Sequence, residues 1–216
     1  MLTLYTYFRS SAAYRVRIAL ALKGLPYESV PVHLVRGGGE QLMPAYRAVN
    51  PAALVPALQD DDAVLTQSMA ILEYLEEAYP KPALLPTGAL DRARVRALAM
   101  TVACDILPLG NLRVLNYLTD TLGASDEARK AWAAHWIALG LGAFEQLLAR
   151  GAATGVFCHG DAPGMADCCL VPQVFNARRF GVDLEQFPQV KRIAEHCDTL
   201  VAFQFAHPAR QADAVA

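Results

Sequence analysis

The feature that most constrains this fold is a change in residue pattern close to residue 80. Before that point, short apolar runs typical of strands alternate with segments of helical spacing, and after it only helical spacing continues. Alternating strands and helices are typical of an α/β unit with a mixed sheet, whereas a run of helices forms an all-α unit. The proline-rich stretch between the two halves is the expected linker. We therefore predict an α/β domain at residues 1–80, a linker at 81–88 and an all-α domain at 89–216.

The first 80 residues predict the element order β-α-β-α-β-β-α. The first helix has signals at both ends, because Ser10 and Ser11 precede its apolar stretch and Lys23-Gly24-Leu25-Pro26 follows it. Three aspartates at 60–62 separate two short apolar runs and predict a hairpin turn. The other expected elements are strands at 2–5 and 27–32, a short helix at 41–47 and a helix at 67–78.

Apolar residues recur at helical spacing through the second half. Pro108 lies within the first stripe and is expected to kink that helix, and two or three shorter helices are expected from Met165 onward. The two stripes are Val95, Leu98, Val102, Ile106, Leu109 and Leu112, and Trp132, Trp136, Leu139, Ala143 and Leu147.

Composition excludes several classes of protein. Apolar residues make up 54% of the chain, enough for a buried core, and the net charge of −2 without a basic block argues against a nucleic-acid partner. The longest run without a charged side chain, residues 131–144, is shorter than the roughly 20 residues that span a membrane. The N-terminus has no signal-peptide pattern, and the five cysteines form no CxxC pair. We expect a cytoplasmic protein with reduced, mostly buried thiols and no membrane partner.

The side chains show no motif of a self-sufficient enzyme. The five histidines form no HxxxH or HExxH pair, and GxSxG, P-loop and GxGxxG motifs are absent. If the chain is an enzyme, its reactive group is therefore expected to come from a bound molecule.

Three segments of the first half have features of a ligand site. Phe8-Arg9-Ser10-Ser11 leads into a helix N-terminus, which favours an anion, although a plain helix cap explains the serines equally well. At Val55-Pro56, a cis bond would leave the Val55 backbone free to pair with an extended peptide, but only about 5–6% of such bonds are cis. Gln67-Ser68 offers amides and a hydroxyl to a carboxylate, with a helix cap again as the alternative.

The segment from Tyr5 to Gly24, YTYFRSSAAYRVRIALALKG, is very similar to the N-terminal signature of zeta-class glutathione transferases, written around SSC-x-W-RVRIALALKG. That class includes maleylacetoacetate isomerase and maleylpyruvate isomerase. The resemblance covers essentially the whole chain. It implies a thioredoxin-like, glutathione-binding domain followed by an all-helical, substrate-binding domain. Further matching segments are Asn50-Pro51, Val55-Pro56, Gln67-Ser68, Asn111-Leu112, Met165-Ala166-Asp167 and His207-Pro208.

Four positions depart from the class pattern. Ala12 replaces the signature cysteine, and Tyr14 replaces the tryptophan two residues later. Leu107 stands where relatives place a Gln or His that contacts glutathione, and Gly164 stands where Ser or Thr usually caps a helix. Gly caps a helix only a few tenths of a kcal/mol worse than Ser, so the last change should be mild.

The resemblance implies a role for each site residue. Ser10 would donate its hydroxyl hydrogen to the glutathione sulfur, beside the amides of Ser11 and Ala12. Ser11 would chiefly orient an amide, and its loss would cost about 1 kcal/mol of helix capping. Arg9 and Arg179 would bind the substrate carboxylates, with a surface ion pair as the alternative for Arg179. Arg15 and Arg17 are expected to be structural or to face a dimer partner. The expected glutathione contacts are Gln41, Val55 and Pro56 for the glycyl and cysteinyl parts, Gln67 and Ser68 for the γ-glutamyl carboxylate, and Leu107, Asn111 and Arg113 from the helical domain.

The implied reaction is the cis–trans isomerisation of a dianionic maleyl ketoacid. Addition of the glutathione thiolate to the conjugated double bond leaves a single bond that can rotate, and elimination then returns the trans isomer. We expect a homodimeric maleylacetoacetate isomerase of tyrosine and phenylalanine breakdown, with maleylpyruvate isomerase of gentisate degradation as the nearest alternative. A general glutathione transferase or dehalogenase, and a non-catalytic glutathione-binding module, are further alternatives.

Overall fold

The computed structural model describes residues 1–215, which form two compact units. Unit 1 contains Met1–Leu84 together with the described residues from Thr199 onward, and unit 2 contains Leu85–Asp198. The division expected from the sequence placed the last 18 residues with the helical half. The described part of this segment belongs to unit 1 because α9 (Val201–Ala206) packs against α1 (Ser11–Leu22), and the Arg17 Nε donates to the Ala206 carbonyl at 3.0 Å.

Unit 1 is built on a mixed four-stranded sheet, which confirms the predicted α/β class. The strand order is β2-β1-β3-β4, with β1 parallel to β2 and antiparallel to β3, and with β3 and β4 forming the expected hairpin. Leu2, Leu4 and Thr6 of β1 are all buried on one face of this central strand. The strands are β1 (Leu2–Thr6), β2 (Tyr27–Pro31), β3 (Ala57–Asp60) and β4 (Ala63–Thr66).

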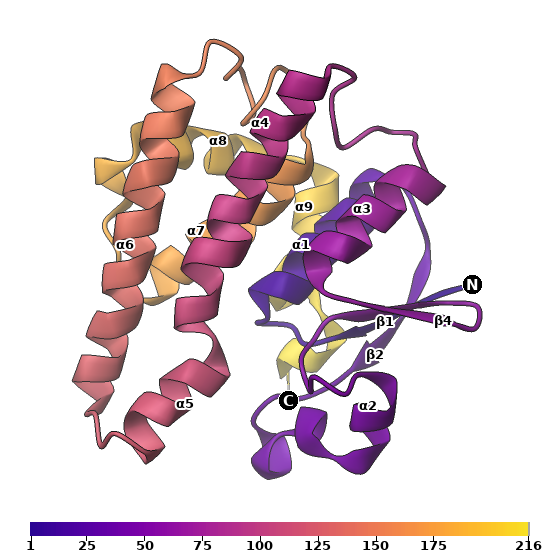
Figure 1. Ribbon diagram of the computed structural model, residues 1–216, viewed down its shortest axis with the longest axis vertical. Coiled ribbons are helices and arrows are strands. Elements are labelled where there is room, and N and C mark those ends of the chain that lie inside the picture. The colour runs from indigo at the N-terminus through magenta and orange to yellow at the C-terminus, as the bar shows by residue number, and fades with distance from the viewer. Residues whose placement is uncertain (216) are drawn as a thin grey trace. The chain divides into compact units, whose positions relative to one another are not determined.

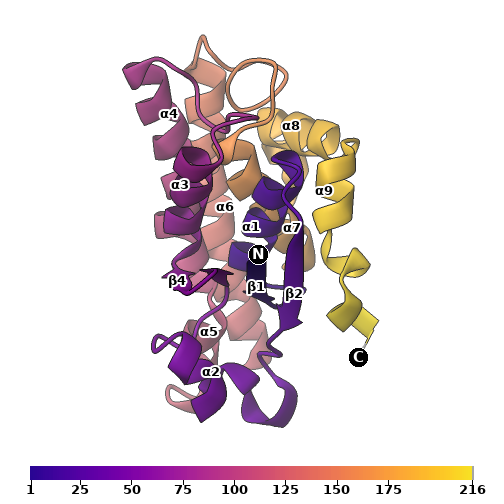
Figure 2. The same ribbon diagram turned by 90° about the vertical axis from the view of Figure 1, so that its right-hand side faces the viewer.

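Helices α1 and α3 (Ser68–Ala78) pack together on one side of this sheet, and α2 (Pro44–Val49) lies on the other (Figures 1 and 2). On the α2 side, Tyr46 joins Tyr7, Val32 and Val55 in a small apolar cluster. The short helix expected at 41–47 is divided, because Gln41 belongs to a 3-10 turn (Glu40–Leu42) and α2 begins only at Pro44. Three further 3-10 turns are Arg36–Gly38, Pro208–Arg210 and Ala212–Val215.

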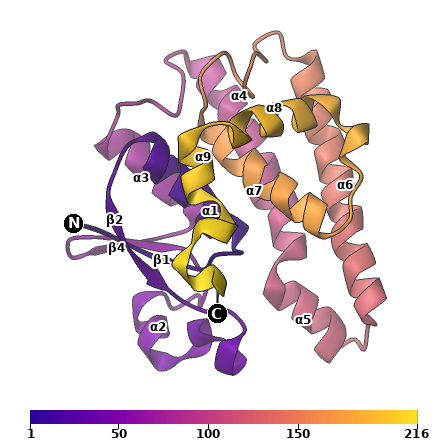
Figure 3. The ribbon, with the colours of Figure 1, turned by 180° about the vertical axis from the view of Figure 1, so that it is seen from behind.

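Unit 2 is helical throughout, as predicted for the second half. Its central helix is α7 (Met165–Arg179), which contacts α4, α6 and α8 and has eleven of its residues buried (Figure 3). Asp167 of α7 accepts hydrogen bonds from the amides of Gly164 and Cys158, both at 2.9 Å, and so completes its half of a capping box. The other helices are α4 (Ala89–Met100), α5 (Leu112–Asp120), α6 (Asp126–Arg150), a 3-10 turn (Leu184–Gln186) and α8 (Pro188–Asp198).

The first helical stretch of unit 2 is interrupted where Pro108 predicted a kink. After α4 the backbone passes through a π turn (Thr101–Ile106) and a 3-10 turn (Leu107–Gly110) before α5 begins. Among the described residues, the stretch Ala89–Asp120 is the one long and apolar enough to cross a membrane by length and composition. This stretch changes helix type along its length, and its first part, α4, packs against α7.

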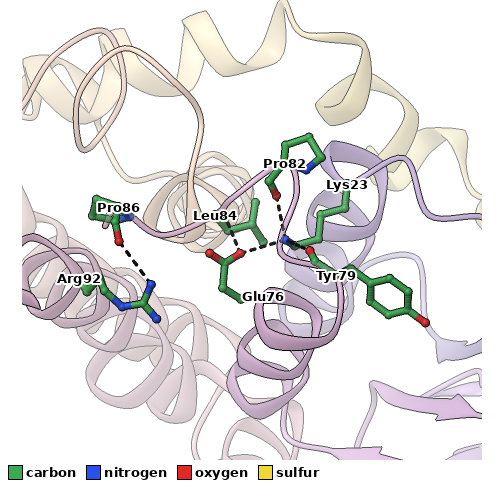
Figure 4. Close-up of polar contacts among 7 residues, drawn as sticks. All are labelled: Lys23, Glu76, Tyr79, Pro82, Leu84, Pro86 and Arg92. Carbon is green, nitrogen blue, oxygen red and sulfur yellow. Dashed lines mark hydrogen bonds and ion pairs between the residues drawn. The ribbon is translucent and has the colours of Figure 1, made fainter. Parts of the chain in front are cut away.

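A buried ion pair fixes the chain that leaves α3 (Figure 4). The Lys23 side chain is 0% exposed, and its Nζ donates to Glu76 Oε2 at 2.9 Å and to the carbonyls of Tyr79 and Pro82 at 2.7 and 2.8 Å. Glu76 also accepts the Leu84 amide at 2.8 Å. All three ammonium hydrogens therefore have acceptors, and residues 79–84 are tied to α1 and α3.

Replacing Lys23 by Met should destabilise the protein strongly, because the buried Glu76 carboxylate would lose the ammonium group that pairs with it. We expect the free energy of unfolding to fall by about 3–5 kcal/mol, measured by denaturant titration. Lys191 is the matched control, since it pairs with Glu185 at the surface. Lys191→Met should change stability by at most about 1 kcal/mol. Equal effects of the two substitutions would contradict the assigned role of Lys23.

The five cysteines are all free thiols, and four of them are buried. Burial raises the pKa of the Cys158 and Cys197 thiols well above the ordinary value. The thiolate is the reactive form, so these two side chains stay unreactive at pH 8. Cys104 is the exposed member.

Native protein should therefore give one fast-reacting thiol per chain with an aromatic disulfide reagent at pH 8, and the Cys104→Ser variant should give none. Unfolded wild-type protein should release all five and serves as the control. Two or more fast-reacting thiols in the folded protein would show that the buried cysteines are accessible.

Candidate active site

The loop between β1 and α1 presents Ser10 at a helix N-terminus. Ser10 has extended backbone angles and is the N-cap of α1, because its Oγ accepts the Ala13 amide at 3.2 Å. A hydroxyl that accepts this bond still has its own hydrogen to donate. The structure corrects the expectation that Ser11 provides the cap, since Ser11 is the first helical residue and is buried. Loss of the Ser10 hydroxyl should thus cost about 1 kcal/mol of stability in addition to any effect on a ligand.

The buried Arg17 side chain binds the loop between β1 and α1. It is 0% exposed, and its Nη1 donates to Thr6 Oγ1 at 3.0 Å and to the Tyr7 carbonyl at 3.3 Å. Its Nη2 donates to the Phe8 carbonyl at 3.0 Å. Burial lowers the pKa of Arg17 to about 10, which still leaves it cationic at neutral pH. Because this side chain is buried inside unit 1, it does not face a dimer partner. Of the two roles expected for Arg17, the structural one is therefore correct.

The C-terminal segment holds the same loop through Asp213. Its Oδ2 accepts the Phe8 amide at 2.9 Å, so both backbone groups of Phe8 are bound, one by Arg17 and one by Asp213. Sequence reasoning missed Asp213, because a contact across 205 residues leaves no local signal.

Arg9 folds back on the residues before it. Its Nε and Nη2 donate to the Tyr7 hydroxyl at 3.2 and 2.9 Å, and its guanidinium lies 5.2 Å from the centre of the Phe8 ring. The cation beside Ser10 is thus held by aromatic neighbours. Ala12 lies in the first turn of α1 and offers only its backbone.

The loop before β3 presents the Val55 backbone. The Val55–Pro56 bond is cis, and among the described residues neither backbone group of Val55 makes a hydrogen bond. The preceding carbonyl, of Leu54, accepts the Tyr46 hydroxyl and the Asn50 side-chain amide, both at 2.7 Å. Burial raises the pKa of Tyr46 to about 12, so this hydroxyl keeps its proton.

The third segment, Gln67-Ser68, opens α3. Gln67 has φ 67° and ψ 109°, a backbone conformation that is strained for a residue with a side chain and that is found at ligand sites more often than elsewhere. Ser68 is the first residue of the helix, and its Oγ accepts a hydrogen bond from Arg15 Nη1 at 3.2 Å.

Sheet register brings the three segments together at one edge of the sheet. Tyr5 pairs with Ala57, and Ala57 pairs with Thr66. The chain after β1, the chain before β3 and the chain after β4 therefore meet at the same edge, as expected where strands of opposite direction alternate. Ser10, Val55 and Gln67 belong to these three connections.

The other predicted contacts belong to other elements of the two units. Gln41 is in the loop after β2, where its Nε2 donates to the Leu34 carbonyl at 3.4 Å. In unit 2, Leu107 begins the 3-10 turn, and Asn111 caps α5 by accepting the Arg113 amide at 3.1 Å. Arg179 ends α7 with its guanidinium 5.2 Å from the centre of the Phe180 ring.

Comparison with known proteins agrees with this architecture. Residues 4–83 match the family model of the glutathione S-transferase N-terminal domain, and residues 126–199 match that of the C-terminal domain. A maleylacetoacetate isomerase of Pseudomonas aeruginosa is 53% identical over 211 residues, covering 97% of each chain. A maleylpyruvate isomerase of Ralstonia sp is 51% identical over 210 residues, covering 97% of this chain and 98% of the relative.

Solved structures give the same result. A holo maleylpyruvate isomerase, described as a bacterial zeta-class glutathione S-transferase, has a TM-score of 0.95 at 51% identity and covers 98% of this chain and 99% of its own. A maleylacetoacetate isomerase of Methylobacterium extorquens AM1, solved with malonate and glutathione, has a TM-score of 0.95 at 44% identity. The match covers 99% of this chain and 100% of that one. The chain therefore belongs to the glutathione S-transferase family. Within that family it falls in the zeta class, with the maleylacetoacetate and maleylpyruvate isomerases.

Asp213→Ala should loosen the loop that carries Ser10, because the Phe8 amide loses its acceptor. We expect exchange of the Phe8 amide hydrogen to become roughly ten- to hundredfold faster, the size of a lost hydrogen bond to a charged group. Asp183→Ala is the control, since that carboxylate accepts the Glu185 amide in unit 2. Unchanged protection at Phe8 would show that Arg17 alone holds the loop.

Proposed function

We propose that this protein is a glutathione-dependent cis–trans isomerase that converts maleylacetoacetate to fumarylacetoacetate. The observation that carries the proposal is that the three segments expected to contact glutathione meet at one sheet edge, in a chain 53% identical to a maleylacetoacetate isomerase. Tyrosine and phenylalanine breakdown is the pathway in which such an enzyme acts.

The residues of unit 1 fit glutathione. The unpaired backbone of Val55 suits an extended peptide, and the N-termini of α1 and α3 suit a thiolate and a carboxylate. Bound glutathione would supply the thiol nucleophile, since Ala12 replaces the signature cysteine and has no thiol of its own.

The chain's own residues would hold and orient the reacting groups. Ser10 would donate its hydroxyl hydrogen to the sulfur, while the amides of Ser11 and Ala12 face the same helix end. The remaining contacts proposed for glutathione are Gln41, Val55, Pro56, Gln67, Ser68, Asn111 and Arg113, with Leu107 at the position that is polar in relatives.

The substrate proposed for this site is a dicarboxylate. Arg9 and Arg179 are the cations assigned to its two carboxylates and to the charge that develops during isomerisation. Ligands with several carboxylates occur in related structures, as malonate with glutathione in one, and dicarboxyethyl glutathione with the tricarboxylate citrate in another. We also propose a homodimer in the cytoplasm, as is typical of the family.

Maleylpyruvate is the second candidate substrate, favoured by the 51% identity to a maleylpyruvate isomerase. The two ketoacids differ by about one methylene, which a hydrophobic pocket distinguishes by only about 1–3 kcal/mol. The ratio of kcat/KM for the two substrates decides between them.

Purified protein should isomerise one or both ketoacids with glutathione and neither without it. S-methylglutathione should not replace glutathione, because it keeps every binding group but lacks the thiol. The measurement is the change in substrate absorbance on isomerisation. Equal rates with and without glutathione would contradict the proposal. Tight glutathione binding without isomerisation would favour a binding module, and faster turnover of aryl halides or α-haloacids would favour a general transferase or a dehalogenase.

A further inference from the structure

Arg15 is a buried cation whose hydrogen-bonding capacity is largely unused. It lies in the middle of α1 and is 1% exposed. Its Nη1 donates to Ser68 Oγ at 3.2 Å, but its Nε and Nη2 find no hydrogen-bond partner among the described residues. No ion pair to Arg15 is formed in this part of the chain.

The neighbouring arginine shows how unusual this is. Arg17, two residues later in the same helix, is equally buried and makes four hydrogen bonds to oxygen atoms of unit 1. A buried guanidinium without such partners costs free energy, so its retention calls for a physical reason. Arg15 does not serve as a second clamp of the β1–α1 loop, because its one bond goes to α3.

The bond to Ser68 defines what Arg15 can do. A serine hydroxyl has one hydrogen to donate, and here its oxygen already accepts the Arg15 N–H. The Ser68 hydrogen is therefore left to donate to a ligand, and the cation behind the oxygen polarises the O–H bond and strengthens it as a donor. Ser68 also opens α3, a helix of 11 residues whose N-terminal end favours negative charge.

We propose that Arg15 is a positioning residue that tunes the carboxylate site at the N-terminus of α3 through Ser68. This inference rests on the proposed function, since the carboxylate concerned is that of the γ-glutamyl residue of glutathione. Arg15 fixes the direction of the Ser68 hydroxyl and adds positive charge beneath it. The strained backbone of Gln67 turns the chain into the helix immediately before this point.

The test compares two ligands that differ only at the carboxylate. One is glutathione, and the other is γ-aminobutyryl-cysteinyl-glycine. This analogue lacks the γ-glutamyl carboxylate but keeps the neighbouring amine and the cysteinyl thiol that Ser10 would contact. Calorimetry gives the Kd of each. Wild-type protein should bind glutathione at least tenfold more tightly than this analogue, and Arg15→Met should reduce that ratio at least fivefold while leaving the Kd of the analogue within about twofold.

Two further variants separate positioning from folding. Arg15→Lys keeps the charge and should retain more of the ratio than Arg15→Met. In Ser68→Ala, the additional change Arg15→Met should have less effect than in wild type, because the hydroxyl that Arg15 orients is gone. Arg47→Met, which removes an exposed arginine from α2, is the control for charge alone and should leave the ratio unchanged.

The results that would contradict the role of Arg15 differ from the result that would contradict the proposed function. Equal weakening of both ligands by Arg15→Met would indicate a purely structural role and overturn the inference, as would a wild-type protein that binds both ligands equally. If Arg15→Met does not fold, Arg15→Lys decides in the same way, because equal weakening of both ligands overturns the inference again. Failure of wild-type protein to bind glutathione at all would instead contradict the proposed function.

Discussion

The candidate site depends above all on one buried guanidinium, that of Arg17. It binds the side chain of Thr6 and the carbonyls of Tyr7 and Phe8, which are the residues that lead from the central strand to Ser10. The same group binds the Ala206 carbonyl and so attaches the C-terminal segment, from which Asp213 reaches the Phe8 amide. A loop without regular secondary structure is thus held on both sides. This rigidity allows a single hydroxyl to be presented in a fixed direction.

The order of strands and helices was predictable from the sequence because its signals are local. Ser10 and Ser11 before an apolar run, and Lys23-Gly24 after it, marked the first helix, and the aspartates at 60–62 marked the hairpin. Pro108 marked a real interruption of the helical stretch that follows α4. The sequence also singles out the three segments proposed to contact glutathione, although each has a plain helix cap or turn as its alternative. Their meeting at one sheet edge became clear only from strand register.

Other features depend on contacts between residues that are distant in the chain. Asp213 and Phe8 are 205 residues apart, and Arg15 and Ser68 are 53 apart, so no spacing rule reveals either pair. The C-terminal segment looked like part of the helical half because it is helical, and its packing on α1 is a tertiary effect. The assignment of the cap to Ser10 rather than Ser11 depended on one residue of helix register, which sequence patterns do not resolve.

If Ser10 stabilises the thiolate of bound glutathione, its loss must change the pKa of that thiol, which is read from the ultraviolet absorbance as a function of pH. We expect Ser10→Ala to raise this pKa by about one to two units, the size of a hydrogen bond to a charged group. Ser125→Ala removes an equivalent cap from α6, where Ser125 Oγ accepts the Ala128 amide at 3.2 Å, and should leave the pKa unchanged. Ser11→Ala should have the smaller effect of the two adjacent serines. An unchanged pKa in Ser10→Ala, or a larger rise in Ser11→Ala, would show that Ser10 does not stabilise the thiolate.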